Sequence, residues 1–176
     1  MMSSTALSST VSSIPDVPGT LNVYSHSDDW RALALANFGV FPYELDGVVC
    51  VSIEGFIQGI KFAPDDPVRV QAFQSHGWSA KHLGKGAGRE WVWWNGQRLA
   101  YGSTEHHALI ARAIRSKAAQ NGGVRLALRA CAGLVFRHDI GEPIPPTTSL
   151  PADVYCRILT ELRDELLRTG SVADAR

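Results

Sequence analysis

The hydrophobic and polar positions of the chain follow two periods, and each period predicts one kind of element. Apolar residues spaced three and four apart are typical of helices that bury one face. Short apolar runs are typical of strands, which we expect at 21–25 and 133–137. Helical spacing predicts helices at 52–62, 68–75, 104–119, 124–130 and 152–169, and a shorter one that starts at 79 and runs into a glycine-rich loop ending at 89.

Local signals define where these elements begin and turn. Ser52 and Thr104 each stand directly before a helical pattern, in the place that an N-cap side chain takes. Asp46-Gly47 separates the short runs 43–45 and 48–50, and Asn95-Gly96 separates 91–94 from 97–101. Because these dipeptides tolerate the positive φ angles of a two-residue turn, we expect a β-hairpin at each of them.

Length and composition predict one folded domain with a tail at each end. A chain of 176 residues in which 45% are hydrophobic has room for one core. Residues 1–20 are rich in Ser, Thr and Pro, and too poor in apolar residues to order themselves. We therefore expect a disordered segment at 1–20, a domain at 21–170 and a disordered C-terminal tail at 171–176.

Charge and cysteine usage exclude several classes of protein. Seventeen Lys and Arg balance seventeen Asp and Glu, so no global positive field draws the chain to nucleic acid or membrane, although a local basic patch stays open. No apolar run approaches the roughly 20 residues that cross a bilayer, and no signal peptide is visible. We expect a cytoplasmic protein that uses no membrane.

The cysteines and histidines do not predict a metal site. Cys50, Cys131 and Cys156 are far apart in apolar contexts, which favours reduced, buried thiols over disulfides or zinc ligands. His106 and His107 are adjacent and diverge by about 100° on a helix, so they cannot chelate one ion together. We expect no metal and no cofactor.

The predicted helix 52–62 carries the strongest chemical pattern. Glu54, Gln58 and Lys61 share one face, opposite an apolar arc formed by Ile53, Phe56, Ile57 and Ile60. Gly55 and Gly59 lie beside the polar stripe and cost about 1 kcal/mol each relative to Ala, so a ligand or another backbone should approach there closely. The pattern permits a pocket wall, or an ordinary amphipathic helix with solvated charges.

The segment ANFGVFPYELDGVVCVSIEGFIQGIKF resembles the opening of the NADAR (YbiA-like) family. Asn37-Phe38, Leu45-Asp46-Gly47, Ser52, Glu54, Gln58 and Lys61-Phe62 match its S-N-F, L-D-G, S-x-E and Q-x-x-K-F motifs. Downstream, the W-N-G-Q-R hairpin, HDIG and the helix bearing Tyr155-Cys156-Arg157 match one branch of the family. The likeness covers residues 22–166.

This resemblance implies a compact, mostly helical α+β domain with short hairpins that hydrolyses a C–N bond to ribose. The implied substrates are ADP-ribose-like or ribosylated small molecules and modified nucleobases, such as ADP-ribose on guanine or a riboflavin-pathway intermediate, and extend to ADP-ribosylated nucleic acid. Lys61 would form a Schiff base with C1 of the opened ribose, and Glu54 would serve as acid and base. Attack requires a neutral Lys61, which burial favours and the Glu54 carboxylate opposes.

Other residues are candidates for substrate binding. The motif matches add Asn37, Phe38 and Gln58 to the pocket, and Gly55, which stands where many members of the family have His, is a further candidate. Trp91 and its neighbours Trp93 and Trp94 offer a stacking surface for a base or, equally in keeping with a hairpin, part of the core.

Two loops add further candidates. Lys81 and Gly84, with Lys85 and Arg89, suit either a diphosphate site or a solvated loop. His138 and Asp139 either line the site or stabilise a turn.

Two further functions compete with the hydrolase. A non-hydrolytic module that binds ADP-ribose or an NAD derivative, in defence or counter-defence, would share the pocket. A purely structural or partner-binding domain is the third reading. An acid beside an amine favours the enzyme, because binding a diphosphate-ribose requires no acid–base carboxylate.

Overall fold

The computed structural model describes residues 14–145 and 147–175, and within them six short strands form three two-stranded sheets. Strand β1 (Thr20–Asn22) pairs in parallel with β6 (Val135–Arg137). Strands β2 (Tyr43–Leu45) and β3 (Val48–Cys50) form one antiparallel hairpin, and β4 (Trp91–Trp94) and β5 (Gln97–Ala100) form the other. The two hairpins lie where the turn dipeptides predict them.

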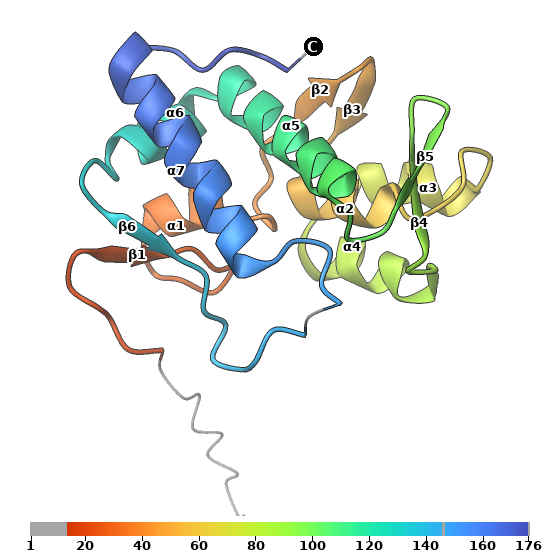
Figure 1. The fold of residues 1–176 in the computed structure, drawn as a ribbon, viewed down its shortest axis with the longest axis horizontal. Helices are drawn as coiled ribbons and strands as arrows, with labels where there is room; N and C mark the ends of the chain where they lie inside the picture. The colour runs from red at the N-terminus through yellow and green to blue at the C-terminus, as the bar shows by residue number, and fades with distance from the viewer. Residues whose placement is uncertain (1–13, 146, 176) are drawn as a thin grey trace, which may run out of the picture.

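Helices make up most of the regular secondary structure of the described residues, so the expected mostly helical α+β class is confirmed (Figure 1). Helices α5 and α7 cross the centre, with α1, α6 and the β1–β6 sheet at one side and α2, α3, α4 and the β4–β5 hairpin at the other. In chain order the helices are α1 (Trp30–Leu35), α2 (Ile53–Gly59), α3 (Pro67–Phe73), α4 (Gly77–Leu83) with the 3-10 turn η1 (Gly84–Gly86), α5 (Thr104–Gln120), α6 (Gly122–Arg129) and α7 (Ala152–Thr169).

The hairpin turns use the backbone geometry that their residues favour. Asp46 and Asn95 have φ angles of 50° and 46°, and the glycines that follow them are also left-handed. Two consecutive positive φ angles are the mark of a type I′ turn, whose twist matches that of the flanking strands. The Trp94 indole N–H donates to Asp46 Oδ2 at 2.6 Å and thereby links the two hairpins.

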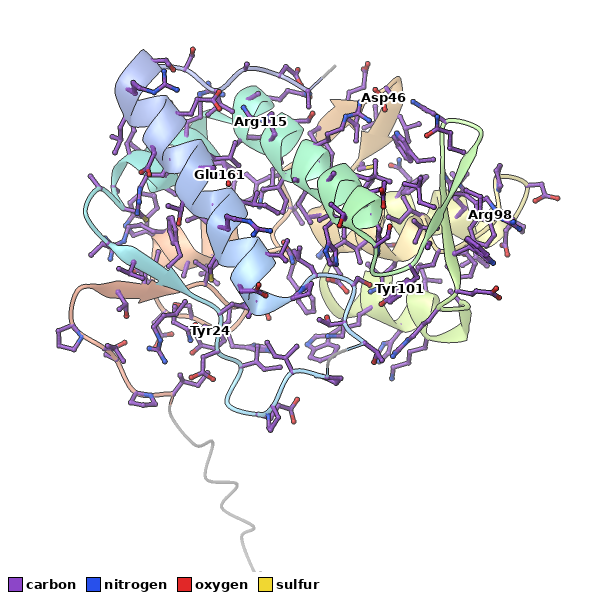
Figure 2. All side chains as sticks on the ribbon, in the orientation of Figure 1. Tyr24, Asp46, Arg98, Tyr101, Arg115 and Glu161 are labelled. Carbon is purple, nitrogen blue, oxygen red and sulfur yellow. The ribbon has the colours of Figure 1, made fainter. Side chains whose placement is uncertain are left out.

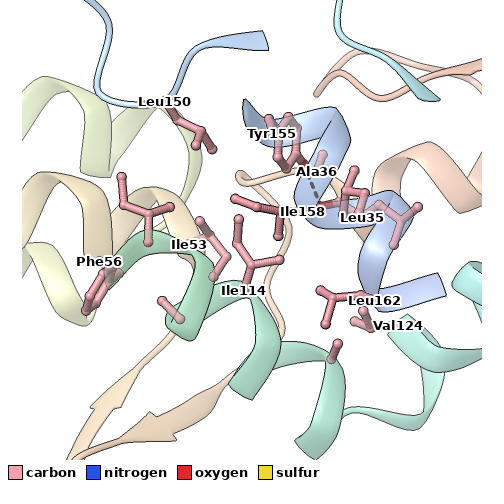
Figure 3. Packing of buried hydrophobic residues seen from close by; sticks show 14 of the residues in the cluster. Leu35, Ala36, Ile53, Phe56, Ile114, Val124, Leu150, Tyr155, Ile158 and Leu162 are labelled. Carbon is pink, nitrogen blue, oxygen red and sulfur yellow. Dashed lines mark hydrogen bonds between the residues drawn. The ribbon is translucent and has the colours of Figure 1, made fainter. Parts of the chain in front are cut away.

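The core lies between the central helices and the elements on both sides of them (Figure 3). Helix α7 buries the positions that its periodicity predicts, Val154, Ile158, Leu162 and Leu166. Helix α5 likewise buries Leu109, Ile110, Ala113 and Ile114. These residues form one continuous cluster with Phe56 of α2 and Leu35 of α1.

Several element boundaries differ from the sequence prediction. Helix α2 ends at Gly59 rather than at 62, because the N–H groups of Lys61 and Phe62 bond three residues back in a tighter turn. Ser103, not Thr104, caps α5 through its hydroxyl. Helix α4 begins at Gly77, two residues before the predicted start.

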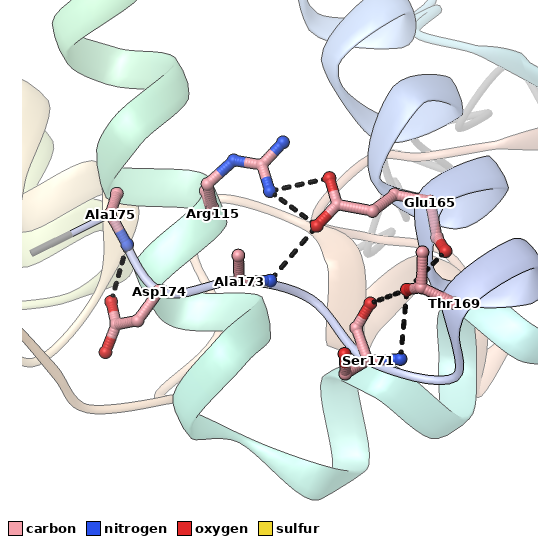
Figure 4. A network of polar contacts seen from close by, with 7 residues as sticks. All are labelled: Arg115, Glu165, Thr169, Ser171, Ala173, Asp174 and Ala175. Carbon is pink, nitrogen blue, oxygen red and sulfur yellow. Dashed lines mark hydrogen bonds and ion pairs between the residues drawn. The ribbon is translucent and has the colours of Figure 1, made fainter.

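The C-terminal segment is also a correction, because residues 171–175 make specific contacts where a disordered tail was expected (Figure 4). Glu165 of α7 accepts hydrogen bonds from Arg115 of α5 and from the Ala173 backbone N–H. Asp174 accepts from Ser116, and Val172 is buried. Of the expected N-terminal tail, residues 1–13 lie outside the described residues, and Thr20 belongs to β1.

Candidate active site

A cavity of about 700 Å³ collects residues from both sides of the molecule. Its walls come from the α1–α2 connection, helices α2 and α4, the loop after β6, and the start of α7. Tyr24, next to β1, and Tyr101, next to β5, both line it, and Figure 2 shows that they project from different parts of the ribbon. A cavity of this size holds a ligand as large as a nucleotide.

Glu54, Gln58 and Lys61 form a hydrogen-bonded chain at the buried end of this cavity. The Gln58 amide donates from Nε2 to Glu54 Oε1 at 2.7 Å, and Lys61 Nζ donates to Gln58 Oε1 at 2.6 Å. The three residues are only 7%, 6% and 8% exposed. Every residue of α2 is buried, so this helix is not the solvated amphipathic helix that the pattern left open.

Burial shifts the pKa values of both charged members of this chain toward their neutral forms. It lowers the pKa of Lys61 to about 8, against an opposing effect of the Glu54 carboxylate and with support from Arg89 and Lys81. Burial also raises the pKa of Glu54, while its hydrogen bond from Gln58 opposes the rise. Compared with exposed side chains, Glu54 therefore keeps its proton more readily and Lys61 loses its proton more readily. This combination suits acid catalysis by the carboxyl and nucleophilic attack by the amine.

The neighbouring elements hold α2 in place by its backbone. Ser52 caps its N-terminus, and the Glu54 N–H donates to Asn37 O at 2.9 Å. At the other end, the Arg69 guanidinium of α3 donates to the carbonyl oxygens of Gly59 and Phe62. The turn that carries Lys61 is therefore fixed by α3.

The two glycines of α2 serve helix packing rather than ligand contact, which corrects the placement of Gly55 in the substrate site. A Cβ on Gly55 would lie 2.5 Å from the carbonyl oxygens of Ala72 and Ser75. A Cβ on Gly59 would lie 2.3 Å from the Phe73 ring. Their bare surface admits the end of α3, and neither glycine lines the cavity.

Four other predicted binding residues do line the cavity: Asn37, Phe38, Lys81 and Gly84. Position 84 must be glycine to leave room for the Gln58 side chain, because a Cβ there would lie 1.7 Å from Gln58 Oε1. The buried Asn37 Oδ1 has no hydrogen-bond partner among the described residues, which leaves an acceptor for a ligand.

In the HDIG turn, His138 lines the cavity and Asp139 stabilises the turn, so each of the two predicted roles is found at one residue. His138 lines the cavity, and its Nδ1 donates to Val23 O at 2.6 Å. Asp139 does not line it, which corrects its place in the substrate site. Its carboxylate accepts from the Gly141 N–H and from Arg137, as in a stabilised turn.

The tryptophans of the β4–β5 hairpin lie outside the cavity, so the stacking role expected for Trp91 is wrong. The Arg98 guanidinium covers the Trp91 ring at 4.2 Å from its centroid, and Trp94 packs in the core against Phe56 and Phe73. The tryptophan that does line the cavity is Trp78, which is absent from the residues predicted from the sequence. Starting the helix at 77 places Trp78 and Lys81 on one face, and this spacing was the available signal.

The structure offers little to bind a metal. Among residues 14–145 and 147–175, no three His, Cys, Asp or Glu side chains are grouped as metal ligands. Cys50, Cys131 and Cys156 are free thiols. In the same part of the chain, none of the helices has the length and apolar character to cross a membrane.

Comparison with known proteins gives matches of three kinds: a family model, a protein similar in sequence, and a solved structure. Residues 29–164 match the family model "Bacteriophage protein GP30.3". A protein of Enterobacteria phage T4, described as an uncharacterized 17.1 kDa protein in the Gp30-rIII intergenic region, is 30% identical over 142 residues, covering 78% of this chain and 93% of its own. The NMR structure of E. coli YbiA superposes with a TM-score of 0.62 and 20% identity, over 88% of this chain and 89% of YbiA.

Proposed function

The chain belongs to the bacteriophage GP30.3 family and is a NADAR/YbiA-like protein, and on this premise we propose that it hydrolyses the C–N bond of an ADP-ribosyl or ribosylamine compound. The observation that carries the proposal is the Glu54–Gln58–Lys61 chain at the buried end of the cavity. A binding module has no need to bury an amine and a carboxyl together, because removing charged groups from water costs free energy.

In the proposed reaction, neutral Lys61 Nζ attacks C1 of the ring-opened ribose. The bond from C1 to the leaving nitrogen breaks, and Glu54 donates a proton to that nitrogen so that the base or amine departs neutral. The product on the enzyme is an imine between C1 and Nζ. One water adds to C1, Glu54 takes back a proton, and the imine opens to the free sugar and the lysine amine.

The charges that line the cavity support an anionic substrate. Apart from the reacting pair Lys61 and Glu54, three of its side chains are cationic and one is acidic, although the chain as a whole is neutral: Lys81, Lys85 and Arg89 against Glu142. A phosphate or diphosphate next to the ribose would meet this excess of positive charge. Binding would place C1 near Lys61 and so reduce the entropy cost of attack.

Incubation with ADP-ribosylated DNA, ADP-ribosylated protein, NAD and a ribosylaminopyrimidine, followed by mass spectrometry, identifies the bond that is cut. Borohydride added during turnover should leave an adduct on Lys61, since it reduces an imine to a stable amine. Lys61→Ala and Lys61→Arg should both lose turnover and the adduct, with melting temperatures close to the parent's. The arginine variant keeps the positive charge, so its failure isolates the nucleophile.

The outcomes separate the hydrolase from its rival. An adduct on another residue, or full activity in Lys61→Ala, contradicts the Schiff-base mechanism. Tight binding of ADP-ribose with no C–N cleavage anywhere in the panel contradicts the hydrolase and supports the non-hydrolytic binding module.

A further inference from the structure

An exposed aromatic cluster lies at the open end of the same cavity. Trp78 of α4 is 52% exposed and yet lines the cavity together with Phe38 and His26. The Phe38 ring meets Trp78 edge-on with centroids 5.5 Å apart, and the His26 ring is inclined by 29° to the Trp78 ring with centroids 6.5 Å apart. Two aromatic rings from other segments, together with His82 one turn further along α4, thus surround the Trp78 indole.

The environment of Trp78 differs from that of the tryptophans with a structural role. Trp94 is buried, and its indole N–H is bonded to Asp46. Trp91 is covered by the Arg98 guanidinium. About half of Trp78 remains open to solvent, although a large exposed aromatic surface contributes nothing to the core. An exposed indole on a cavity wall is suited to stacking on a flat ligand group.

Cationic groups lie between this cluster and the buried amine. Lys81 Nζ is 5.4 Å from the centroid of the Trp78 ring and 5.7 Å from that of Phe38. Lys81 also acts electrostatically on both Glu54 and Lys61, and Arg89 acts on Lys61. From the open end inward, the cavity therefore presents the aromatic rings around Trp78, then Lys81, and then the Glu54–Gln58–Lys61 chain.

We propose that Trp78 is the stacking platform for a nucleobase at the end of the substrate remote from the reacting ribose carbon, with Lys81 beneath the phosphates that join the two. This inference rests on the proposed function for the ribose end, and it names the substrate class. The substrate therefore carries a nucleoside diphosphate on its ribose, which a simple ribosylamine lacks. A lone ribose phosphate would leave Trp78 uncovered.

Calorimetric titration with two ligands tests the assignment. ADP-ribose carries the remote base, and ribose 5-phosphate lacks it. Trp78→Ala should weaken ADP-ribose about 10- to 100-fold, which is what one base–aromatic stack contributes. It should change the affinity for ribose 5-phosphate less than twofold, and Trp78→Phe should restore most of the loss because it keeps an aromatic face.

Trp30 provides a matched control, since it is also 52% exposed but does not line the cavity. Trp30→Ala should bind both ligands as the parent does. Equal weakening of the two ligands in Trp78→Ala, an unchanged affinity for ADP-ribose, or a parent protein that does not bind ADP-ribose would each overturn the proposal. Loss confined to ADP-ribose supports it even if no turnover is found, so failure of the hydrolase would be recognised separately.

Discussion

At the scale of single residues, Gln58 determines how Glu54 and Lys61 act on each other. Its amide accepts from the lysine and donates to the carboxylate, so the two charged groups are joined without a direct ion pair. A direct pair would hold both groups in their charged forms. With the amide between them, burial outweighs their attraction, and the pKa of Lys61 falls to about 8.

The dependence of activity on pH should show this lowered pKa. Activity requires a neutral Lys61, which forms as the pH rises, and a protonated Glu54, which is lost as the pH rises, so kcat/KM should follow a bell-shaped profile with the midpoint of one limb near 8. Gln58→Glu places a second carboxylate beside Lys61, which favours the ammonium form and should move the midpoint upward. Initial rates of C–N cleavage between pH 6 and 10 give both profiles. A parent midpoint near 10.5, the ordinary value for lysine, would contradict the assignment.

At the scale of elements, the close packing of α2 on α3 explains the glycines that the sequence placed beside the polar stripe. The helical period correctly puts Gly55 and Gly59 away from the apolar arc and requires some close approach. It cannot tell whether a ligand or a protein segment approaches. The structure shows the Phe73 ring and two carbonyl oxygens at the end of α3 in that space.

Substitution of Gly59 should therefore lower the stability of the protein, and weaken ligand binding only as a consequence. In Gly59→Ala the new methyl group meets Phe73, which packs against Phe56 in the core and cannot retreat freely. We expect a loss of about 1–3 kcal/mol in the free energy of unfolding, despite the better helix propensity of Ala, with weaker ADP-ribose binding alongside. Urea unfolding and calorimetry measure the two effects.

Gly86→Ala is the control for this substitution, because a Cβ there meets nothing within 4 Å. It should leave the free energy of unfolding close to the parent's. If Gly59→Ala is as stable as the parent but no longer binds ADP-ribose, the glycine contacts the ligand after all.

The elements that the sequence predicts best are those with strong local signals. The two hairpins follow from Asp-Gly and Asn-Gly, and the 17- and 18-residue helices α5 and α7 are long enough for the period to repeat several times. Helix α1 has only six residues, and its sequence pattern predicts no element. Fewer than two turns give no measurable period, and the Asp29 cap was the remaining signal.

At the scale of the whole molecule, the site depends on contacts that no local pattern contains. The motif residues Glu54, Gln58 and Lys61 could be chosen because they lie within three turns of one segment. The aromatic wall could not, since Trp78 meets His26 and Phe38 only through the packing of α4 beside the strand and loop segments. The hairpin tryptophans look similar in sequence, but they face Arg98 and the core.

Lys117 lies where three distant segments meet. It is wholly buried on α5, and its Nζ donates to the carbonyl oxygens of Ala36 at 3.0 Å and Leu35 at 3.4 Å. The Tyr155 hydroxyl of α7 donates to the same Leu35 oxygen at 2.8 Å (Figure 3). The end of α1, from which Asn37 and Phe38 reach the cavity, is thus held by α5 and α7 together.

The buried amine of Lys117 should make the stability of the whole protein depend on pH. Burial lowers its pKa in the folded state to about 7, against 10.5 for an ordinary lysine, so between these values the unfolded chain binds one more proton. The free energy of unfolding therefore gains up to about 1.4 kcal/mol per pH unit from this residue as the pH rises from 7 toward 10.5, and loses this gain as the pH falls back to 7. Lys117→Met should remove that part of the slope in urea unfolding at pH 7, 8 and 9, whereas Lys85→Met, which removes an exposed lysine, should keep the slope of the parent. Lys61 is present in all three proteins, so a difference in the slope of unfolding free energy against pH comes from Lys117. Equal slopes in the parent and Lys117→Met would show that the Lys117 amine stays charged where α1, α5 and α7 meet.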